Sequence, residues 1–397
     1  MPHLELALAA LGWVLALGWM LDPNTMSMHT FYQARLLRSY IGASNPNRQA
    51  ADITDAERHD DVYLRDELAG GGPYHLINTT LNLVGGDDLA TAQRLASPFV
   101  FSPLYCGSSD RTGYRQTRHY MDGRLTLGTA VAISGAAASP NMGSQTPSAA
   151  LAMLMTLMNV RLGYWVATPH LSSWRSRQPR LWPFYTVREF LSQTDDRGSY
   201  SYLTDGGHFD NTGVYSLIQR GCRYIVMADC GADPQPSYAD LGNLARRCRI
   251  DFGAEISLDT TPFDGNRRRQ ARTHFVVGTV KYAAAHLKRL YQLTTDAEVA
   301  AVPDTGVIVW IKPSRVVGDE ADLRQYALER HVFPQETTAD QWYDEAQFES
   351  YRRLGQRSAE AAFPDPLVDR SGDPPAPPCS HSLSASTPSG RRPDGGR

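Results

Sequence analysis

Short apolar runs, separated by turn-forming residues, account for most of the chain from residue 74 onward. Runs that are rich in β-forming residues and bounded by Gly, Pro or Asn are typical of strands or buried segments. Three of them occupy residues 75–83, 99–104 and 125–133. Ala, Leu and Met recur at helical spacing through residues 148–166, which predicts a core helix; a helix in contact with lipid is the alternative.

A strand, a glycine turn, a short helix and a second strand follow one another between residues 201 and 227. Asn211 or Thr212 can cap the helix and Gly221 can end it. Residues 224–227 form an uninterrupted apolar run, as expected of a strand that is covered on both faces. This order of elements is that of the βαβ unit of a parallel sheet.

Three more strands are expected further along the chain, with helices between them. The strands fall at residues 250–256, 275–280 and 307–311, and a helix falls at residues 236–247. The alternation of strands and helices predicts an α/β fold, with a mostly parallel sheet flanked by helices.

The N-terminal segment is strongly apolar. Residues 4–20 carry one acidic residue, and they are one turn shorter than the roughly 20 residues that span a bilayer. Trp13 and Trp19 favour a helix that spans or lies on a membrane; a signal peptide and a buried helix of a soluble domain are the alternatives. Arg35 and Arg38 follow, which by the positive-inside rule predicts a body on the cytoplasmic side.

These patterns divide the chain into four expected parts. The segment after residue 369 is rich in Pro, Ser and Gly and cannot bury enough apolar surface to fold. We therefore expect an apolar membrane-associated helix over residues 1–23, a connector over 24–73, an α/β body over 74–369 and a disordered tail over 370–397.

The amino-acid composition argues against several classes of function. Hydrophobic residues make up 42% of the 397 residues, which is enough for a sizeable core. Lys and Arg number 39 against 42 Asp and Glu, which argues against a general nucleic-acid binder. The five cysteines form no C-x-x-C pair, so they predict reduced thiols rather than a zinc ribbon or a disulfide framework. Glycine motifs for nucleotides are absent from the sequence, so no cofactor is expected.

Two acidic residues, Asp205 and Asp229, come directly after predicted strands. In open α/β sheets, ligands and catalytic groups gather at this edge. Asp205 precedes Gly206 and Gly207, whose lack of a Cβ atom lets a substrate or a nucleophile approach the carboxylate closely. The alternative is that Asp205 only caps the turn by accepting hydrogen bonds from the amides that follow it.

Residues 204–213, with the sequence TDGGHFDNTG, resemble the aspartate motif of the patatin-like and cytosolic-phospholipase-type lipid acyl hydrolases. Residues 132–140, AISGAAASP, resemble the small-residue segment that precedes this motif in the family. The wider resemblance, to a group of large bacterial membrane-associated patatin-like proteins, covers about residues 24–313. It implies a patatin-like fold that hydrolyses glycerophospholipid or lysophospholipid esters through a Ser–Asp dyad, with a lipid ester and a membrane surface as partners.

The same resemblance implies roles for individual residues. Asp205 is the dyad aspartate, and it can accept a proton without a histidine only if partial burial raises its pKa toward neutrality. His208 is a nearby proton carrier. The residues expected to shape the turn and the site are Gly206, Gly207, His208, Asn211 and Asp229.

One departure from the family pattern concerns the nucleophile. The family places a serine in a Gly-x-Ser-x-Gly elbow at a strand-to-helix turn, and this sequence contains no such motif. The nearest match is Ser134, with alanine at both outer positions, after the glycines at 70–72. Ser134 is therefore the candidate nucleophile by order alone. The other expectation is that the chain is the C-terminal part of an incomplete fold, with the nucleophile half absent, truncated or supplied by another polypeptide.

Two further functions remain open at this point. A membrane-associated pseudoenzyme or binding module accounts directly for the missing elbow. A metal-dependent hydrolase is the other alternative, since carboxylate and imidazole ligands gather near two predicted strand ends. The ligands would come from Asp205, His208, Asp210, Asp229 and Asp233.

Overall fold

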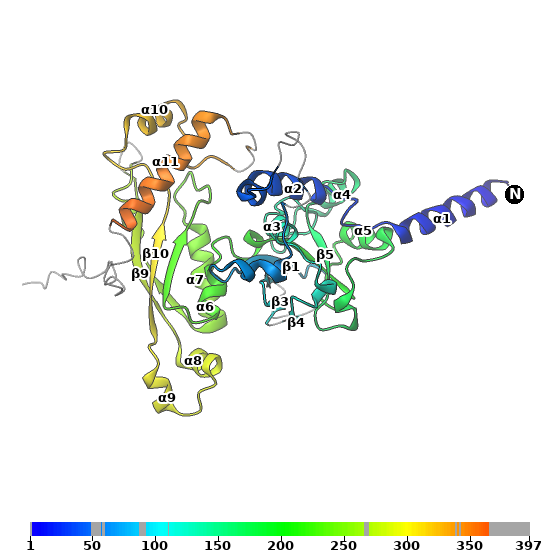
Figure 1. The fold of residues 1–397 in the computed structure, drawn as a ribbon, viewed down its shortest axis with the longest axis horizontal. Coiled ribbons are helices and arrows are strands. Elements are labelled where there is room, and N and C mark those ends of the chain that lie inside the picture. The colour runs from blue at the N-terminus through cyan, green and yellow to red at the C-terminus, as the bar shows by residue number, and fades with distance from the viewer. Residues whose placement is uncertain are drawn as a thin grey trace, which may run out of the picture. The chain divides into compact units, whose positions relative to one another are not determined.

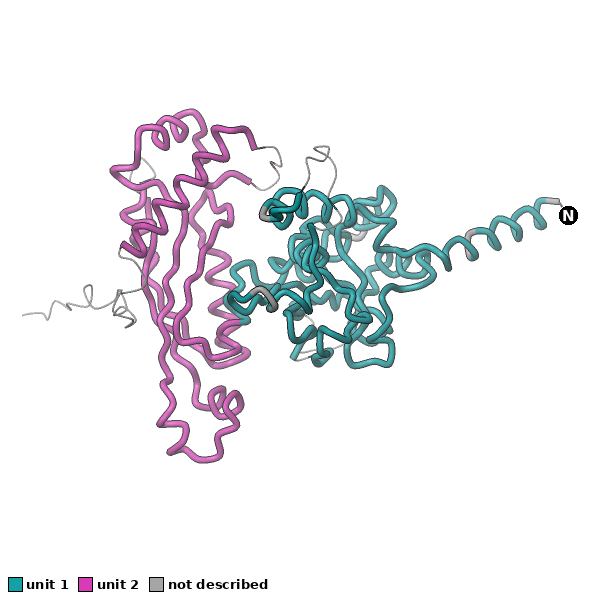
Figure 2. The backbone as a smooth tube through the Cα atoms, in the orientation of Figure 1, with its two compact units in different colours: residues 1–216 teal, residues 217–397 magenta. Residues whose placement is uncertain are grey.

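The computed structural model divides the chain into two compact units, residues 1–216 and residues 217–397 (Figure 2). Each unit has a sheet of its own. The structure describes residues 2–48, 57, 60–86, 93–109, 111–265, 270–337, 340 and 343–364. The tail predicted over residues 370–397 lies outside the described residues.

A six-stranded antiparallel sheet forms the centre of unit 1, in the order β4-β3-β2-β1-β6-β5 (Figure 1). Its strands are β1 (Ile77–Asn82), β2 (Ala96–Phe101), β3 (Tyr105–Ser108), β4 (Gly113–Gln116), β5 (Tyr164–Ala167) and β6 (Tyr200–Asp205). Almost every residue of the neighbouring strands β1 and β6 is buried, so both faces of the sheet are covered there. The core is built on large buried side chains that include Phe99, Trp165 and Tyr202.

Unit 1 also contains helices. They are α1 (Pro2–Met20), α2 (His29–Leu36), α3 (Leu127–Ser134), α4 (Ala149–Leu157), α5 (Trp182–Phe190) and the start of α6 (Val214–Gln219). α3 packs on β1 and β6, and α2 packs on α3. In the described part of the chain, one helix is long and apolar enough to cross a membrane: His3–Met20 of α1, of which 6% is buried.

Unit 2 contains a four-stranded mixed sheet in the order β7-β10-β9-β8. Its strands are β7 (Tyr224–Ala228), β8 (Glu255–Ser257), β9 (Phe275–Lys281) and β10 (Thr305–Ile311). Its helices are α7 (Ala239–Phe252), α8 (Ala284–Tyr291), α9 (Asp296–Ala301), α10 (Ala321–Glu329) and α11 (Glu345–Ala362). Buried residues of α10 and α11, among them Leu323 and Leu354, form a smaller second cluster.

The chain is a mixed α/β protein, as predicted, but the prediction of a mostly parallel sheet is wrong. Among the strands described, β7 and β10 form the one parallel pair, and every other pairing is antiparallel. The βαβ unit predicted between residues 201 and 227 is not formed, because β6 pairs within the sheet of unit 1 and β7 within that of unit 2.

Three predicted segments have a different secondary structure. Of the strand predicted over residues 250–256, residues 250–252 lie in α7 and only residues 255–256 lie in β8. Residues 125–133, predicted as a strand or buried segment, lie mostly in α3, because the Thr126 side chain caps the helix by accepting a hydrogen bond from the Thr129 amide at 3.1 Å. The single helix predicted over residues 148–166 is split into α4 and β5, with Asn159 in the left-handed region (φ 57°) between them. α4 is also not a core helix, because its leucines and Met153 are exposed.

A buried ion pair joins two segments of unit 1. Arg161 donates to Glu189 at 2.8 Å and to the Pro23 carbonyl at 3.1 Å, while the Trp165 indole also donates to Glu189, at 2.7 Å. The Arg161 and Glu189 side chains are both almost completely buried. Asn24 completes the junction by pairing with the backbone of Trp165 in both directions. This network attaches the segment after α1 to the edge strand β5.

We expect Glu189→Gln to lower the free energy of unfolding by about 3–5 kcal/mol, because it leaves the Arg161 charge buried without its counter-charge. Urea unfolding of the purified chain measures the change. Asp122→Asn is the matched control in the same unit. It removes the exposed pair with Arg177 and should leave the stability almost unchanged, because solvent screens this pair. Equal stability of Glu189→Gln and the wild type would contradict a structural role for the pair.

Candidate functional site

Asp205 is the last residue of β6, and its side chain caps the turn that follows. β6 pairs with β1 in a register that sets Asp205 opposite Thr79. The chain then enters a single 3₁₀ turn, Gly206–His208, and the Asp205 Oδ1 atom accepts a hydrogen bond from the Gly207 amide at 2.6 Å. The turn-capping alternative from the sequence is therefore realised in the structure. It uses only part of the hydrogen-bonding capacity of the carboxylate.

At both glycine positions after Asp205, a Cβ atom would come too close to a neighbouring atom. A Cβ atom on Gly206 would lie 2.6 Å from the backbone oxygen of Asn78, in β1. A Cβ atom on Gly207 would lie 2.7 Å from the Asn211 side-chain oxygen and 3.1 Å from Asp205 Oδ1. Any side chain at either position would displace the turn. The structure thus places Gly206, Gly207 and Asn211 directly around Asp205.

An open hollow of about 470 Å³ lies over this turn. Its wall is drawn from segments that are far apart in the sequence: α2, the start of β1, the end of α3 and the turn after β6. The polar residues of the wall are Tyr32, His75, Asn78, Ser134, Asp205, Asp210, Asn211 and Thr212. The structure therefore brings both candidate catalytic residues, Ser134 and Asp205, to one hollow.

Burial raises the pKa of Asp205 to about 6, and the hydrogen bond from Gly207 opposes the shift only in part. No cationic side chain forms an ion pair with Asp205 among the described residues. Burial also raises the pKa of the Tyr32 phenol, and the nearby Asp205 charge raises it further. Asp205 is thus charged at neutral pH but close to its protonated form, as a general base requires.

Ser134 is placed differently from a nucleophile in an elbow. It is the last residue of α3, and its Oγ atom donates a hydrogen bond to the backbone oxygen of Asn78 at 2.8 Å. The C-terminus of a helix carries the negative end of the helix dipole, which disfavours an alkoxide or an oxyanion there. The glycines at 71 and 72 have positive φ and face open space, in the segment between a 3₁₀ helix and β1.

His208 and Asp210 serve the turn itself. His208 is buried, its Nδ1 atom is 2.9 Å from the Thr204 hydroxyl, and burial lowers its pKa to about 4. It does not line the hollow. Asp210 accepts hydrogen bonds from the Thr212 amide, the Thr212 hydroxyl and the Tyr215 amide, at 2.7–3.1 Å. Because His208 does not line the hollow and its Nδ1 atom is bonded to Thr204, the geometry gives His208 a packing role.

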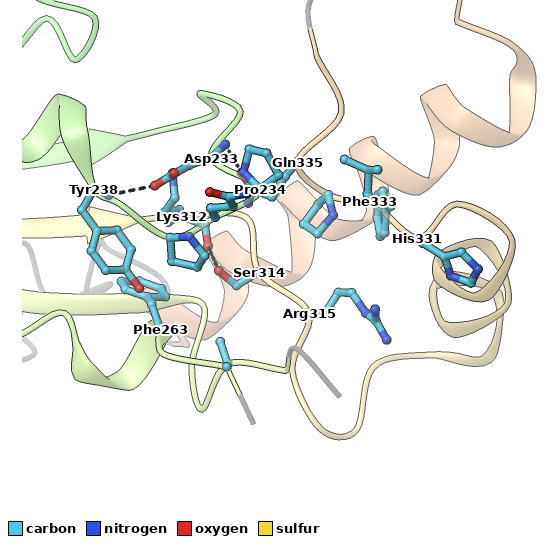
Figure 3. A pocket seen from close by; sticks show the side chains of 16 residues that line it. Asp233, Pro234, Tyr238, Phe263, Lys312, Ser314, Arg315, His331, Phe333 and Gln335 are labelled. Atoms are coloured by element: carbon cyan, nitrogen blue, oxygen red, sulfur yellow. Dashed lines mark hydrogen bonds between the residues drawn. The ribbon is translucent and has the colours of Figure 1, made fainter. Parts of the chain in front are cut away.

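Asp229 belongs to unit 2. It follows β7 and is buried, and its Oδ2 atom accepts from the Lys312 ammonium at 3.1 Å and from the Trp310 indole at 3.3 Å. Lys312 and Asp233 border a separate cavity of about 390 Å³ within unit 2 (Figure 3). The Asp233 carboxylate accepts from the amides of Ser237 and Tyr238 at 2.9–3.1 Å. The carboxylates of Asp229 and Asp233 are therefore bonded to groups of unit 2.

A metal centre has no support in the described residues. Nowhere in that part of the chain do three or more His, Cys, Asp or Glu side chains gather closely enough to hold a metal ion. Of the five ligands considered from the sequence, Asp205, His208 and Asp210 lie in unit 1, and Asp229 and Asp233 lie in unit 2.

Comparison with solved structures shows a distant similarity. No protein-family model matches the chain, and no curated protein matches it. Among solved structures, human GIVD cytosolic phospholipase A2 is a weak neighbour, with a TM-score of 0.42 and 13% sequence identity. The similarity covers 78% of this chain and 46% of the phospholipase chain, so this chain spans less than half of that protein.

Sequence reasoning missed two residues of the hollow, Tyr32 and Asn78. Tyr32 comes from α2, and its hydroxyl lies against Gly135, where a Cβ atom would be 2.5 Å away. Asn78 holds Ser134 through its backbone oxygen and accepts a hydrogen bond from the Ser216 hydroxyl through its side chain. Tyr32 lies in no motif, so the sequence carries no local signal for it. Asn78 lies in residues 75–82, which belong to the stretch that resembles the family, but nothing in the sequence marks it as a site residue.

Asp205→Asn should make the protein more stable at pH 8 than the wild type, by about 1–3 kcal/mol. The pKa of Asp205 is raised from 3.8 to about 6, so the folded state binds the proton more tightly than the unfolded state. The stability linked to Asp205 is therefore complete below pH 4 and is lost as the pH rises through 6. The asparagine variant does not lose stability in this way, so the difference in free energy of unfolding between variant and wild type should disappear near pH 4. Urea unfolding at several pH values measures the difference.

Asp210→Asn, in the same loop, is the control. Its carboxylate bonds three donors, so its loss should destabilise the chain by about 1 kcal/mol at pH 8. Burial also raises the pKa of Asp22 to about 6, so only the difference between variant and wild type isolates Asp205. Destabilisation of Asp205→Asn at pH 8 would show that the carboxylate is structural.

Proposed function

We propose that unit 1 carries a lipid acyl hydrolase site in which Asp205 is the general base and Ser134 is the hydroxyl that the chain brings to the hollow. The observation that carries the proposal is the Asp205 carboxylate, which faces the hollow without a cationic partner and has a pKa of about 6. The resemblance of residues 204–213 to the patatin-like aspartate motif supports glycerophospholipid or lysophospholipid esters as substrates.

The chemistry would proceed in two acyl-transfer steps. Asp205 accepts the serine proton while the serine oxygen attacks the ester carbonyl. The ester C–O bond then breaks, and the alcohol part of the lipid leaves with the proton that Asp205 holds. Asp205 next takes a proton from water, which attacks the acyl-serine; the fatty acid is released and the proton returns to the serine oxygen. Ser134 must first leave the Asn78 carbonyl, which a rotation about its Cα–Cβ bond between staggered positions accomplishes. Asp205 is in its basic form above pH 6, so the reaction rate should rise with pH through that value.

A second candidate function is a lipid-binding module that has lost its catalytic step. The placement of Ser134 favours it, because the hydroxyl is engaged by Asn78 at the C-terminal end of α3 rather than at the start of a helix. In that case the hollow holds a lipid ester and Asp205 only bonds to it. Supply of the nucleophile by another polypeptide would give the same behaviour in the isolated chain.

We also propose that the chain is membrane-associated, with its body on the cytoplasmic side. The length and apolarity of α1 support the association. The orientation rests on Arg35 and Arg38, which follow α1 and are the basic residues that the positive-inside rule uses. A lipid substrate and a membrane anchor are mutually consistent, because the ester is presented at the bilayer surface.

A fluorophosphonate probe, which bonds covalently to an activated serine, tests the site. With lysophospholipid vesicles present, we expect an adduct on Ser134 that is absent from Ser134→Ala. Asp205→Asn should lower both labelling and lysophospholipid hydrolysis by about 10²–10⁴-fold and should abolish the rise in rate near pH 6. Mass spectrometry locates the adduct, and fatty-acid release measures the hydrolysis.

Asp210→Asn, which alters the same loop without removing the base, is the control and should retain most of the activity. A wild-type chain that is neither labelled nor hydrolytic, yet still binds lysophospholipid, would reject the hydrolase in favour of the binding module. Full activity in Asp205→Asn would remove this residue from the mechanism.

A further inference from the structure

α4 presents the reverse of the pattern expected of a helix on a water-soluble surface. The residues it buries most are small or polar, Ala152 and Thr156, which lie one turn apart on one side. Leucines occupy much of its exposed surface: Leu151 is 48% exposed, Leu154 is 54% exposed and Leu157 is 73% exposed. Helices that face water normally turn charged and polar residues outward. The exposed side of α4 is apolar instead.

The apolar surface continues beyond the helix. Met158 follows α4 directly and is 68% exposed. The next residue, Asn159, donates from its side chain to the backbone oxygen of Met26 at 2.6 Å, which brings the end of α4 to the segment between α1 and α2. Met26 and Met28 in that segment are exposed as well. We call the set Leu151, Leu154, Leu157, Met158, Met26 and Met28 the α4 face.

The α4 face is linked to α1 through α5. α4 packs on α5, and α5 packs on α1. The contact with α1 is close, since a Cβ atom on Gly18 would lie 2.8 Å from the Pro183 ring. Figure 1 shows α1 leaving the body of unit 1 beside α5. An apolar helix of membrane-spanning length and the α4 face thus share one packing partner within the same unit.

Charge is distributed as a lipid headgroup region would require. Residues 149–157 contain no charged side chain. At the end of α1, the Arg180 guanidinium lies over the Trp19 ring, with 5.6 Å between the guanidinium carbon and the ring centroid. Arg175 is exposed in the same segment before α5. Tryptophan and arginine at the end of an apolar helix match the interfacial region of a bilayer that contains anionic lipid.

We infer that the α4 face is a second membrane contact, with α4 lying in the interfacial plane of a phospholipid bilayer beside α1. We assign the α4 face to a bilayer because α1 and the α4 face are both apolar, are both linked to α5 and have arginine residues beside them. A helix without charges that lies in the interface buries its apolar side among the acyl chains. The contact goes beyond the proposed hydrolase, and it holds whether or not Asp205 is catalytic.

The contact has a consequence for the hollow. α2 follows the Met26–Met28 segment and carries Phe31, which is exposed, next to Tyr32, which lines the hollow. Docking of the α4 face would therefore hold the helix that borders the hollow close to the lipid surface. α1 alone, attached at one end, would leave the rotation of unit 1 about the anchor unconstrained.

Hydrogen exchange of the full-length chain tests the contact locally, so that binding through α1 does not obscure it. With phosphatidylcholine–phosphatidylglycerol vesicles, we expect exchange of the amides in residues 150–158 to slow by about tenfold relative to the lipid-free protein. The triple variant Leu154→Gln, Leu157→Gln, Met158→Gln should lose this protection and keep that of α1. Glutamine is a good helix former and the three side chains are exposed, so the fold should be retained.

A matched variant, Ile250→Gln with Leu328→Gln, changes exposed apolar residues of unit 2 and should leave the protection of α4 unchanged. Asp205→Asn should also keep it, which separates this test from that of the hydrolase. Unchanged exchange in α4 on vesicles would overturn the inference. Protection without lipid that grows with protein concentration, together with a dimer mass in sedimentation, would assign the face to a second copy of the chain.

Discussion

The site depends on the close approach of two backbone segments, where the end of β6 meets the start of β1. Gly206 lies so near the backbone oxygen of Asn78 that a Cβ atom there would be 2.6 Å from it. The same oxygen accepts the hydrogen bond of Ser134 at the end of α3. The Asn78 side chain accepts from Ser216. One residue of β1 therefore fixes the turn after β6, the end of α3 and the beginning of α6, and the first two of these line the hollow.

The turn could be predicted from the sequence, but its partner strand could not. An Asp-Gly-Gly triplet after an apolar run is a local signal, and Asp205 does end a strand and cap a turn. Which strand lies beside β6 is decided by pairing between distant residues. β1 and β6 are covered on both faces, so their runs show no alternation that would separate an antiparallel from a parallel neighbour. The expectation of a parallel sheet rests instead on the alternation of strands and helices along the chain and on the apolar run at residues 224–227.

The same limit explains the other differences. Residues 125–133 are rich in β-formers, but Thr126 caps a helix whose small residues Gly128, Ala130 and Ala132 are buried. Tyr32 reaches the hollow only because α2 packs on α3. Over such short segments, packing outweighs the local propensity for helix or strand. The packing partners of a segment cannot be read from its own sequence. The residues found in advance were those whose role is set by their immediate neighbours.

Burial alone does not distinguish a functional carboxylate from a structural one; its partners do. Glu189 is buried with Arg161 and the Trp165 indole, and Asp229 is buried with Lys312 and the Trp310 indole, so each charge is compensated within its own unit. Asp22 has no ion-pair partner among the described residues either, but it closes a turn onto Asn24 and does not line this hollow. Asp205 combines a partly buried charge, a single amide donor and an open hollow in front of it. A folded chain tolerates that cost where the unsatisfied carboxylate has a ligand or a proton to receive, and for this reason Asp205 is the residue that we propose for the chemistry of unit 1.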